Sequence, residues 1–338
     1  MLDTTIAGSL PRPDWLAEPE VLKGAWKLSG DELAEGQRRA AAEWIRHQEA
    51  AGINTLTDGE QFRSHFVHAF LEHIDGIDQQ KKTLMGIRDN RYDLEVPTVT
   101  GPVSRPQPAH VEEFKYVRGL TDRTLKFTLP GPMTICDTIA DAHYGSRPEM
   151  AMAFAELLNQ EARELVAAGA DVIQFDEPAF NVFMDDVNEW GIDALHRAIE
   201  GLNCTTAVHI CYGYGIEENL KWKETLGDEW RQYEKIFPAL NTSRVDQISL
   251  ECAESHVPHS VMGILKDKVV MVGAVAVTPE RIETPEEVAA TIRSAMEYVD
   301  AERLLPCTNC GMTPIPYDIA LGKLKSLTAG AALVRDSL

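Results

Sequence analysis

The sequence predicts an α/β fold, a (β/α)8 barrel of the TIM type with an insertion between its second and third strands. Short apolar, β-branched runs recur at eight places, and helical patterns long enough to cross back over a sheet separate them. These runs are nearly continuous in apolar residues, as parallel strands covered on both faces are. The chain of 338 residues has a normal length for such a barrel, so we expect one domain over residues 1–338.

The eight predicted strands are spread over the whole chain. Each is ended by turn residues, which favours strands over buried helical segments of the same composition. In chain order they are Thr4–Ala7, Ile53–Thr57, Leu125–Leu129, Asp171–Phe175, Thr205–His209, Asp246–Leu250, Val269–Val275 and Arg303–Pro306.

Helix signals lie between these runs. Ser29 and Glu32 have the S-x-x-E spacing of a capping box, an Ala-rich helical pattern follows, and Gly52 stands where a left-handed C-terminal residue belongs. The same order recurs at Met150–Ala168, which Gly169 follows. In both places the next run is a predicted strand and then an acid, which indicates a repeated strand–helix unit.

The stretch from about residue 81 to residue 108 does not fit the alternation. It holds the short run Val96–Thr100 and the turn-rich segment GPVSRPQP. We therefore expect an insertion here. No Pro/Gly/Ser linker or low-complexity tract indicates a second domain.

The charge of the chain excludes some partners. Lys and Arg number 32 against 53 Asp and Glu, a formal net charge of −21. Such a field makes nucleic acid and anionic membrane surfaces poor partners. No apolar run approaches the ~18 residues of a membrane span, and the start MLDTTIAGSLPRP has no basic segment followed by an apolar one. We expect a soluble cytoplasmic protein.

The six cysteines are too few for a secreted disulfide framework in a chain of this length. Cys307 and Cys310 form a C-x-x-C, for which metal or redox chemistry is the better expectation. Each of the other four can simply be a small buried hydrophobe: Cys136, Cys204, Cys211 and Cys252.

Polar, titratable or thiol residues follow nearly every predicted strand. The carboxyl ends of barrel strands meet at one rim, where barrel enzymes keep their chemistry. A purely structural barrel has no reason to place such residues there, so the pattern indicates an active site. The residues are Gly8, Ser9, Asp58, Glu60, Pro130, Pro132, Asp176, Glu177, His209, Cys211, Glu251, Thr278, Cys307 and Cys310.

Four of these residues form a candidate metal site. His209 and Cys211 are two apart on an emerging strand, so their side chains point the same way. Glu251 and Cys310 follow the sixth and eighth predicted strands at the same rim. One imidazole, two thiolates and one carboxylate make a suitable tetrahedral set for Zn²⁺, which we expect as the cofactor.

Other interpretations of these residues stay open. An isolated H-x-C favours His209 as a core histidine and Cys211 as an apolar filler. Cys307 and Cys310 can also bind a metal together or form a redox disulfide. We favour Cys310 alone, because Cys307 ends the apolar run LLPC, where inward packing is expected, whereas Cys310 precedes Gly311 on the rim loop.

Seven motifs together carry a family resemblance: GSLPRP, TDGEQFR, PGPMTI, QFDEPAF, VHICYG, ISLECAES and TNCGM. Their order and spacing resemble the catalytic barrel of the cobalamin-independent methionine synthases over nearly the whole chain. The most specific parts are the H-x-C, the I-S-h-E and the N-x-C-G. The amino-terminal barrel of the long, two-barrel enzymes is missing, so the chain resembles the single-barrel forms.

The resemblance implies a role for each matched residue. It implies that four residues hold a zinc ion, which takes the thiol of homocysteine, that two acids hold the substrate's ammonium group, and that a loop contacts its carboxylate. The implied ligands are His209, Cys211, Glu251 and Cys310, the acids are Glu60 and Asp176, and the loop is Gly8-Ser9. Each acid can instead cap a helix or pair with an arginine. We expect Glu177 to be structural.

The implied activity is a zinc-dependent methyl transfer to homocysteine that forms methionine. A free thiol has a pKa near ~8.5 and is mostly protonated at neutral pH, whereas a metal-bound thiol is deprotonated. Two protein thiolates and a carboxylate leave the metal electron-rich, which keeps such a sulfur reactive. A hydrolase needs the opposite, a site that acidifies water.

The methyl donor is where the chain departs from the family. Folate-using relatives have a histidine in the loop after strand seven and an acid just before it, where this chain has Thr278 and Ala276. Neither residue can protonate a leaving pteridine. The tryptophan after the family's G-P-x-T-I motif is also absent. Methylfolate is therefore in doubt, and a methyl-corrinoid, which leaves without a proton, is the alternative; His256 can also replace the missing acid.

Three functions stay open on the sequence. The first is homocysteine methylation, with a partner protein that can deliver the methyl group. The second is alkylation of another small thiol, against which Glu60 and Asp176 weigh. The third is a hydrolytic or non-catalytic zinc barrel, for which the sequence lacks a two-histidine strand motif and from which we would expect the substrate acids to be lost. Oligomeric state is not fixed.

Overall fold

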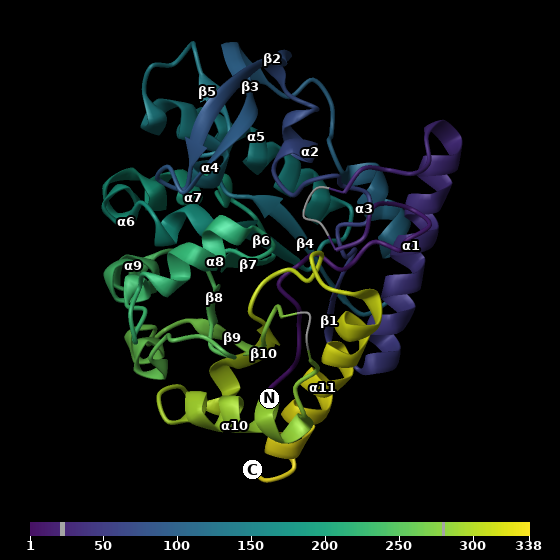
Figure 1. The fold of residues 1–338 in the computed structure, drawn as a ribbon, viewed down its shortest axis with the longest axis vertical. Helices are drawn as coiled ribbons and strands as arrows, with labels where there is room; N and C mark the ends of the chain where they lie inside the picture. Colours follow the sequence, from purple (N-terminus) through teal and green to yellow (C-terminus); the bar gives the residue numbers. More distant parts are fainter. Residues whose placement is uncertain (21–23, 279–280) are drawn as a thin grey trace.

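The computed structural model describes residues 1–20, 24–278 and 281–338. Its centre is a curled, seven-stranded parallel sheet with the order β1-β4-β6-β7-β8-β9-β10 (Figure 1). Seven of the eight predicted strands are confirmed within one or two residues. Their bounds are β1 Thr55–Thr57, β4 Thr124–Pro130, β6 Val172–Asp176, β7 Thr205–His209, β8 Gln247–Glu251, β9 Val269–Val275 and β10 Leu304–Thr308.

The first predicted strand, Thr4–Ala7, differs from the prediction. It is not a regular strand, but it makes single hydrogen bonds to both edges of the sheet. The Thr5 N–H donates to the carbonyl of Pro306 in β10 (3.1 Å), and the Thr55 N–H of β1 donates to the carbonyl of Thr4 (3.0 Å). The extended segment therefore lies between the two edge strands.

Helices flank the sheet, with the longest, α1, α5 and α11, on its outside (Figure 1). The helices are α1 Gly30–Ala51, α2 His68–Leu71, α3 Val111–Arg118, α4 Pro132–Cys136, α5 Arg147–Ala167, α6 Met184–Asp186, α7 Ile192–Ala198, α8 Glu217–Glu224, α9 Gln232–Thr242, α10 Pro285–Met296 and α11 Tyr317–Arg335. None of the described helices is long and apolar enough to cross a membrane.

Of the two predicted ends of α1, the C-terminal one is confirmed and the N-terminal capping box is not. Gly52 ends the helix with a φ of 88°, the left-handed conformation that favours glycine. Ser29 is the N-cap, but its side chain makes no capping hydrogen bond, so the predicted capping box does not form. A capping box is found instead at α10, between Thr284 and Glu287.

The predicted insertion is a β-hairpin. Strand β2 (Asp75–Ile87) pairs antiparallel with β3 (Tyr92–Ser104), and short β5 (Ala140–Asp141) joins β3 in a second sheet. The hairpin lies at the top of the view in Figure 1, near α4 and α5. It begins earlier than residue 81 because the exposed, polar start of β2 carries no apolar run by which the sequence would reveal it.

The two faces of the main sheet have different cores. Outward side chains such as Phe127 and Phe175 are buried against the helices. The inside of the curl holds a small apolar cluster, which includes Val172 and Cys307, and also polar side chains. Lys126 and Gln174 are among the latter, and both are fully buried. The sheet thus leads polar groups toward the rim at its carboxyl end.

Candidate active site

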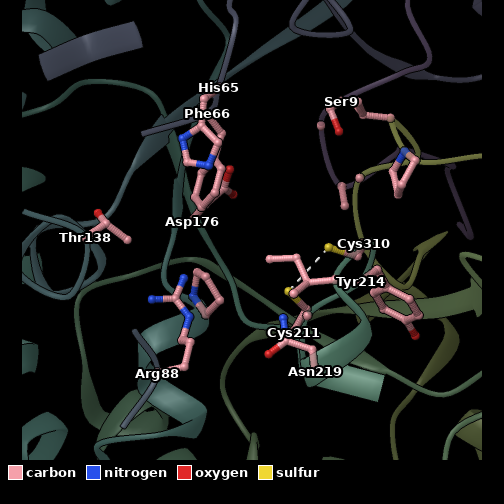
Figure 2. Close-up of a pocket in the computed structure, with 18 of the residues that line it drawn as sticks. Ser9, His65, Phe66, Arg88, Thr138, Asp176, Cys211, Tyr214, Asn219 and Cys310 are labelled. Atoms are coloured by element: carbon pink, nitrogen blue, oxygen red, sulfur yellow. Dashed lines mark hydrogen bonds between the residues drawn. The ribbon is translucent and has the colours of Figure 1, made fainter. Parts of the chain in front are cut away.

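A cavity of about 310 Å³ opens at the carboxyl ends of the strands. Residues from the N-terminal segment, from several strand ends and from the β2–β3 hairpin line it. Figure 2 shows Ser9, Asp176 and the Cys211–Cys310 pair around the same hollow. Of the predicted site residues, seven line it: Gly8, Ser9, Glu60, Asp176, His209, Cys211 and Cys310.

His209, Cys211 and Cys310 form a compact cluster in this cavity. Their potential ligand atoms all lie within 4.8 Å of one another. His209 ends β7, Cys211 follows two residues later on the same side, and Cys310 follows β10. The two sulfur atoms are 3.3 Å apart, and a dashed line joins them in Figure 2. Residues about 100 positions apart in the chain thus meet, as expected of strand ends in a curled sheet.

The His209 ring is oriented for a ligand. Its Nδ1 is 2.8 Å from the Ser249 hydroxyl, which fixes the ring through one nitrogen. Its Nε2 is buried and has no hydrogen-bond partner among the described residues. A buried polar atom of this kind needs a partner, because leaving it unsatisfied costs free energy. With two adjacent sulfur atoms, this nitrogen fits the ligand preferences of zinc.

The cluster is electrostatically coupled. A hydrogen bond from Cys310 and the neighbouring imidazole lower the pKa of Cys211 well below its ordinary value despite burial. The hydrogen bond with Cys211 and burial raise the pKa of Cys310. Burial opposes protonation of His209, but Cys211 and Asp176 outweigh it and raise the pKa of the imidazole. One thiolate is therefore favoured beside a cationic or metal partner.

Glu251 lies next to this cluster but not within it. Its side chain is fully buried at the end of β8. Its carboxylate accepts hydrogen bonds from the Tyr212 N–H (2.6 Å) and the Tyr214 hydroxyl (2.8 Å), and Lys223 Nζ is 3.9 Å away. Burial raises its pKa, and the charge of Cys211 adds to this effect. The carboxylate is thus near Cys211 and turned toward other partners.

Cys307 does not share the cavity. It is buried in the apolar cluster inside the sheet, with an exposed fraction of 1%. Burial raises the pKa of its thiol to about 12. The six cysteines of the chain are all free thiols. The C-x-x-C therefore faces two environments, one apolar and one at the rim.

Asp176 is held in the cavity by a chain of polar contacts. Lys126 Nζ donates to Gln174 Oε1 (2.7 Å), and Gln174 Nε2 donates to Asp176 Oδ1 (2.7 Å). This contact fixes the Gln174 amide so that its NH₂ faces the carboxylate. Burial and the nearby Glu60 raise the pKa of Asp176 to about 7, against the effect of His209. A buried carboxylate in this state gains by pairing with a cation.

Glu60 enters the cavity from the loop after β1. Its carboxylate accepts a hydrogen bond from the Thr128 hydroxyl (2.9 Å). Gly8 packs against it so closely that a Cβ at Gly8 would lie 3.0 Å from Glu60 Oε1. Ser9 follows, and its carbonyl accepts from the Met312 N–H (2.7 Å), which ties this turn to the loop after β10. The two acids and the turn thus line the same cavity.

Glu177 is structural, as the sequence predicts. Its carboxylate accepts from the N–H groups of Met133 (3.0 Å) and Thr134 (2.8 Å) and from the Thr134 hydroxyl (2.6 Å). It therefore caps α4 from outside that helix. Burial raises its pKa to about 7, although these hydrogen bonds oppose the shift.

The loop after β9 carries no titratable side chain at positions 276 and 278, where the folate-using relatives have an acid and a histidine. Ala276 is buried, and its N–H donates to Glu283 (2.8 Å), while the Thr278 hydroxyl donates to Glu254 (3.3 Å). His256 is exposed and stacks on Trp230 (5.3 Å between centroids). It is not a lining residue of the cavity, so the suggested replacement acid does not face this site in the described structure.

Several cavity residues were not predicted from the sequence. Arg12 is buried on the cavity wall, and Tyr214 contacts both the cavity and Glu251. His65 and His68 also line the cavity. Arg12 belongs to the quoted motif GSLPRP and follows two proposed binding residues, which is a signal that could have found it. Tyr214 and His65 lie on loops and His68 begins α2, and no pattern in the sequence places these segments at the cavity.

Comparisons with known proteins agree with this geometry. The family described as the catalytic domain of cobalamin-independent synthase matches residues 2–332. A methionine synthase of Sulfurisphaera tokodaii is 33% identical over 344 residues, covering 100% of this chain and 94% of that protein. One of Saccharolobus solfataricus is 33% identical over 346 residues, covering 100% of this chain and 96% of that protein.

Solved structures give the same result. A B12-independent methionine synthase of a Shewanella species, in complex with selenomethionine, has a TM-score of 0.97 at 56% identity, covering 100% of this chain and 98% of that one. A Listeria monocytogenes protein described as a putative vitamin-B12 independent methionine synthase shares the fold, with a TM-score of 0.73 at 18% identity over 99% of both chains. The chain therefore belongs to the cobalamin-independent methionine synthase family.

Proposed function

We propose that this chain is a methyltransferase that transfers a methyl group to the thiol of homocysteine and forms methionine. The observation that carries the proposal is the cluster of His209, Cys211 and Cys310 in the same cavity as Asp176 and Glu60. A soft-ligand cluster suits a thiol, and two acids suit an ammonium group. The related Shewanella protein, whose structure is described as a complex with selenomethionine, supports a ligand of this class.

His209, Cys211 and Cys310 would hold a zinc ion, with Glu251 as the fourth ligand. When bound, zinc would supply the Lewis acidity that keeps a substrate thiol deprotonated at neutral pH. Glu251 needs to exchange its hydrogen bond with Tyr214 for this role. Ser249 keeps the His209 ring in place through Nδ1, which leaves Nε2 directed at the cluster.

Asp176 and Glu60 would hold the ammonium group of homocysteine, and Gly8-Ser9 would contact its carboxylate. Gln174 keeps one Asp176 oxygen hydrogen-bonded and leaves the other available. The absence of a side chain at Gly8 leaves space for the Glu60 carboxylate. These residues fix the orientation of the substrate, so that its side chain extends toward the sulfur cluster.

The methyl donor enters the same cavity. The hairpin residues Arg88, Arg91 and Tyr92 close its other wall. We infer that methylfolate is a poor donor, because Thr278 and Ala276 supply no general acid. A donor that leaves without a proton, such as a methyl-corrinoid, fits these residues better, and a partner protein is a route for its delivery.

The sheet is proposed to close as a full (β/α)8 barrel in a single domain over residues 1–338. The extended segment Thr4–Ala7 would be the eighth strand, since its hydrogen bonds reach Pro306 on one side and Thr55 on the other. Closure would place Gly8 and Ser9 at the rim beside Cys310, where the loop contact from Met312 to Ser9 already joins them.

The test is methionine formation by the purified, zinc-supplied protein, with methylfolate and methylcobalamin compared side by side. Methionine formed from homocysteine by the parent chain and lost in Cys310→Ser supports the proposal. Control reactions replace homocysteine by cysteine, which tests alkylation of another small thiol. Methylation of cysteine in preference to homocysteine would overturn the substrate assignment.

A further inference from the structure

Arg12 is a buried arginine on the wall of the cavity. It follows the Gly8-Ser9 turn by three residues and has an exposed fraction of 5%. Its Nη2 donates to the backbone carbonyls of Arg63 (2.5 Å) and Ser64 (3.4 Å). The guanidinium lies 5.2 Å from the centroid of the Trp26 ring. The hydrogen bonds thus fix one edge of the guanidinium, and the Trp26 ring covers one of its faces.

The rest of the guanidinium lacks a partner. Nε and Nη1 are buried and make no hydrogen bond to any described residue. No carboxylate of the described chain lies within 4.0 Å of Arg12, although the other two buried arginines each have one: Arg63 pairs with Asp58 at 2.8 Å, and Arg88 pairs with Asp137. A buried cation without an anion is costly. Such a group persists where a ligand satisfies it.

Glu60 is the nearest candidate for a structural partner, and it does not fill this role. Burial lowers the pKa of Arg12, and the charge of Glu60 only opposes this from beyond ion-pair distance. The Glu60 carboxylate instead accepts from Thr128 and raises the pKa of Asp176. The Glu60 carboxylate therefore interacts with Thr128 and Asp176 and forms no ion pair with Arg12.

The cavity thus carries the buried Arg12, which has no anionic partner, beside the two buried acids Glu60 and Asp176; the β2–β3 hairpin adds Arg91 and Glu95 to the lining. The acids, Glu60 and Asp176, suit an ammonium group. A guanidinium presents N–H groups in a planar fork that matches a carboxylate in a bidentate manner. An α-amino acid has both charges on one carbon, so a single ligand can satisfy Arg12 and the two acids together.

We propose that Arg12 binds the α-carboxylate of the amino-acid substrate and makes the site specific for amino acids over simple thiols. The inference rests on the proposed function only for the identity of that amino acid. Gly8-Ser9 would contact the same carboxylate through the backbone, and Arg12 would supply its counter-charge. This makes Arg12 a substrate-binding residue in addition to those that the sequence predicts.

The test compares three probes by isothermal titration calorimetry on the zinc-supplied protein. The probes are L-methionine, the thioether amine that remains when its carboxylate is removed, and the thioether carboxylate that remains when its amine is removed. The variants are Arg12→Gln and Arg12→Lys. Arg39→Gln is the matched control, because Arg39 stacks on Trp15 (4.5 Å) outside the cavity.

We expect Arg12→Gln to weaken the binding of methionine and of the thioether carboxylate by about 10- to 100-fold, which is the range for a lost hydrogen bond to a charged group. The affinity for the thioether amine should change by no more than about twofold, since this probe has no carboxylate for Arg12 to bind. Arg12→Lys should recover part of the loss, because it restores the charge but not the fork. Arg39→Gln should match the parent.

Three results would overturn the inference. Equal methionine affinity in Arg12→Gln and the parent would show that Arg12 does not touch the carboxylate. If Arg12→Gln changed only the affinity for the thioether amine, Arg12 would act solely by offsetting the negative charge of Glu60. Failure of the parent to bind the thioether carboxylate or methionine would also overturn it. The proposed function has a separate readout, because methionine formation by the parent can succeed or fail independently of these affinities.

Discussion

Replacing Asp176 by asparagine tests how the cavity recognises an amino acid. The change keeps the shape of the side chain and its contact with Gln174, but it removes the charge that would pair with an ammonium group. Loss of a hydrogen bond between charged groups costs about 1.5–3 kcal/mol. We therefore expect the dissociation constant of methionine to rise about 10- to 150-fold.

The pH dependence adds a second signature. The raised pKa of Asp176, about 7 in the empty cavity, means that the carboxylate is largely protonated at pH 6 and largely ionised at pH 8. Because an ammonium group binds the ionised form, methionine affinity should strengthen about tenfold from pH 6 to pH 8. Asp176→Asn has nothing to ionise at this position, so this dependence should flatten.

The assay is isothermal titration calorimetry of methionine on the metal-free protein at several pH values. Glu177→Gln is a matched control, because Glu177 is the neighbouring residue and its pKa is also raised to about 7 by burial. It caps α4 and does not line the cavity, so its loss should lower the melting temperature and leave methionine affinity intact. Unchanged affinity in Asp176→Asn would refute the reasoning.

Three further predictions concern other parts of the cavity. Cys211→Ser and Cys310→Ser should lose bound zinc in metal analysis, whereas Cys307→Ser should keep it; loss in Cys307→Ser alone would favour the C-x-x-C pairing. Gly8→Ala should raise the KM for homocysteine about tenfold, since a Cβ there would lie 3.0 Å from a carboxylate oxygen, and unchanged kinetics would show that the loop yields. With methylfolate as donor, methionine formation should be about 10²–10⁴-fold slower than in relatives that have a histidine at the position of Thr278. Thr278→His should not slow this reaction further. Rapid turnover of methylfolate by the parent chain would contradict the prediction.

The main strands were predictable because each is a buried apolar run. The segment Val269–Val275, for example, is buried at all but its first position and contains no polar side chain. The H-x-C was predictable for a related reason, because the period of a strand places His209 and Cys211 on one side. Local patterns of this kind do not depend on the rest of the fold.

The remaining features depend on contacts between distant segments. Glu251 turns toward Tyr214 and Lys223 on the loop and helix after β7, which no spacing in the sequence reveals. Arg12 has no anionic partner because its hydrogen-bonded neighbours in space are backbone carbonyls. The S-x-x-E at Ser29 has the spacing of a capping box, but spacing alone does not decide whether the Ser29 side chain forms the bond, and here it forms none.

The most direct test of the account is a crystal structure of the protein with zinc and homocysteine, in which anomalous scattering identifies the metal. We predict one zinc ion per chain at His209, Cys211 and Cys310, with the amine of homocysteine at Asp176 and its thiol directed toward the metal. A metal bound elsewhere, or homocysteine in the cavity with its thiol directed away from Cys211 and Cys310, would contradict the account.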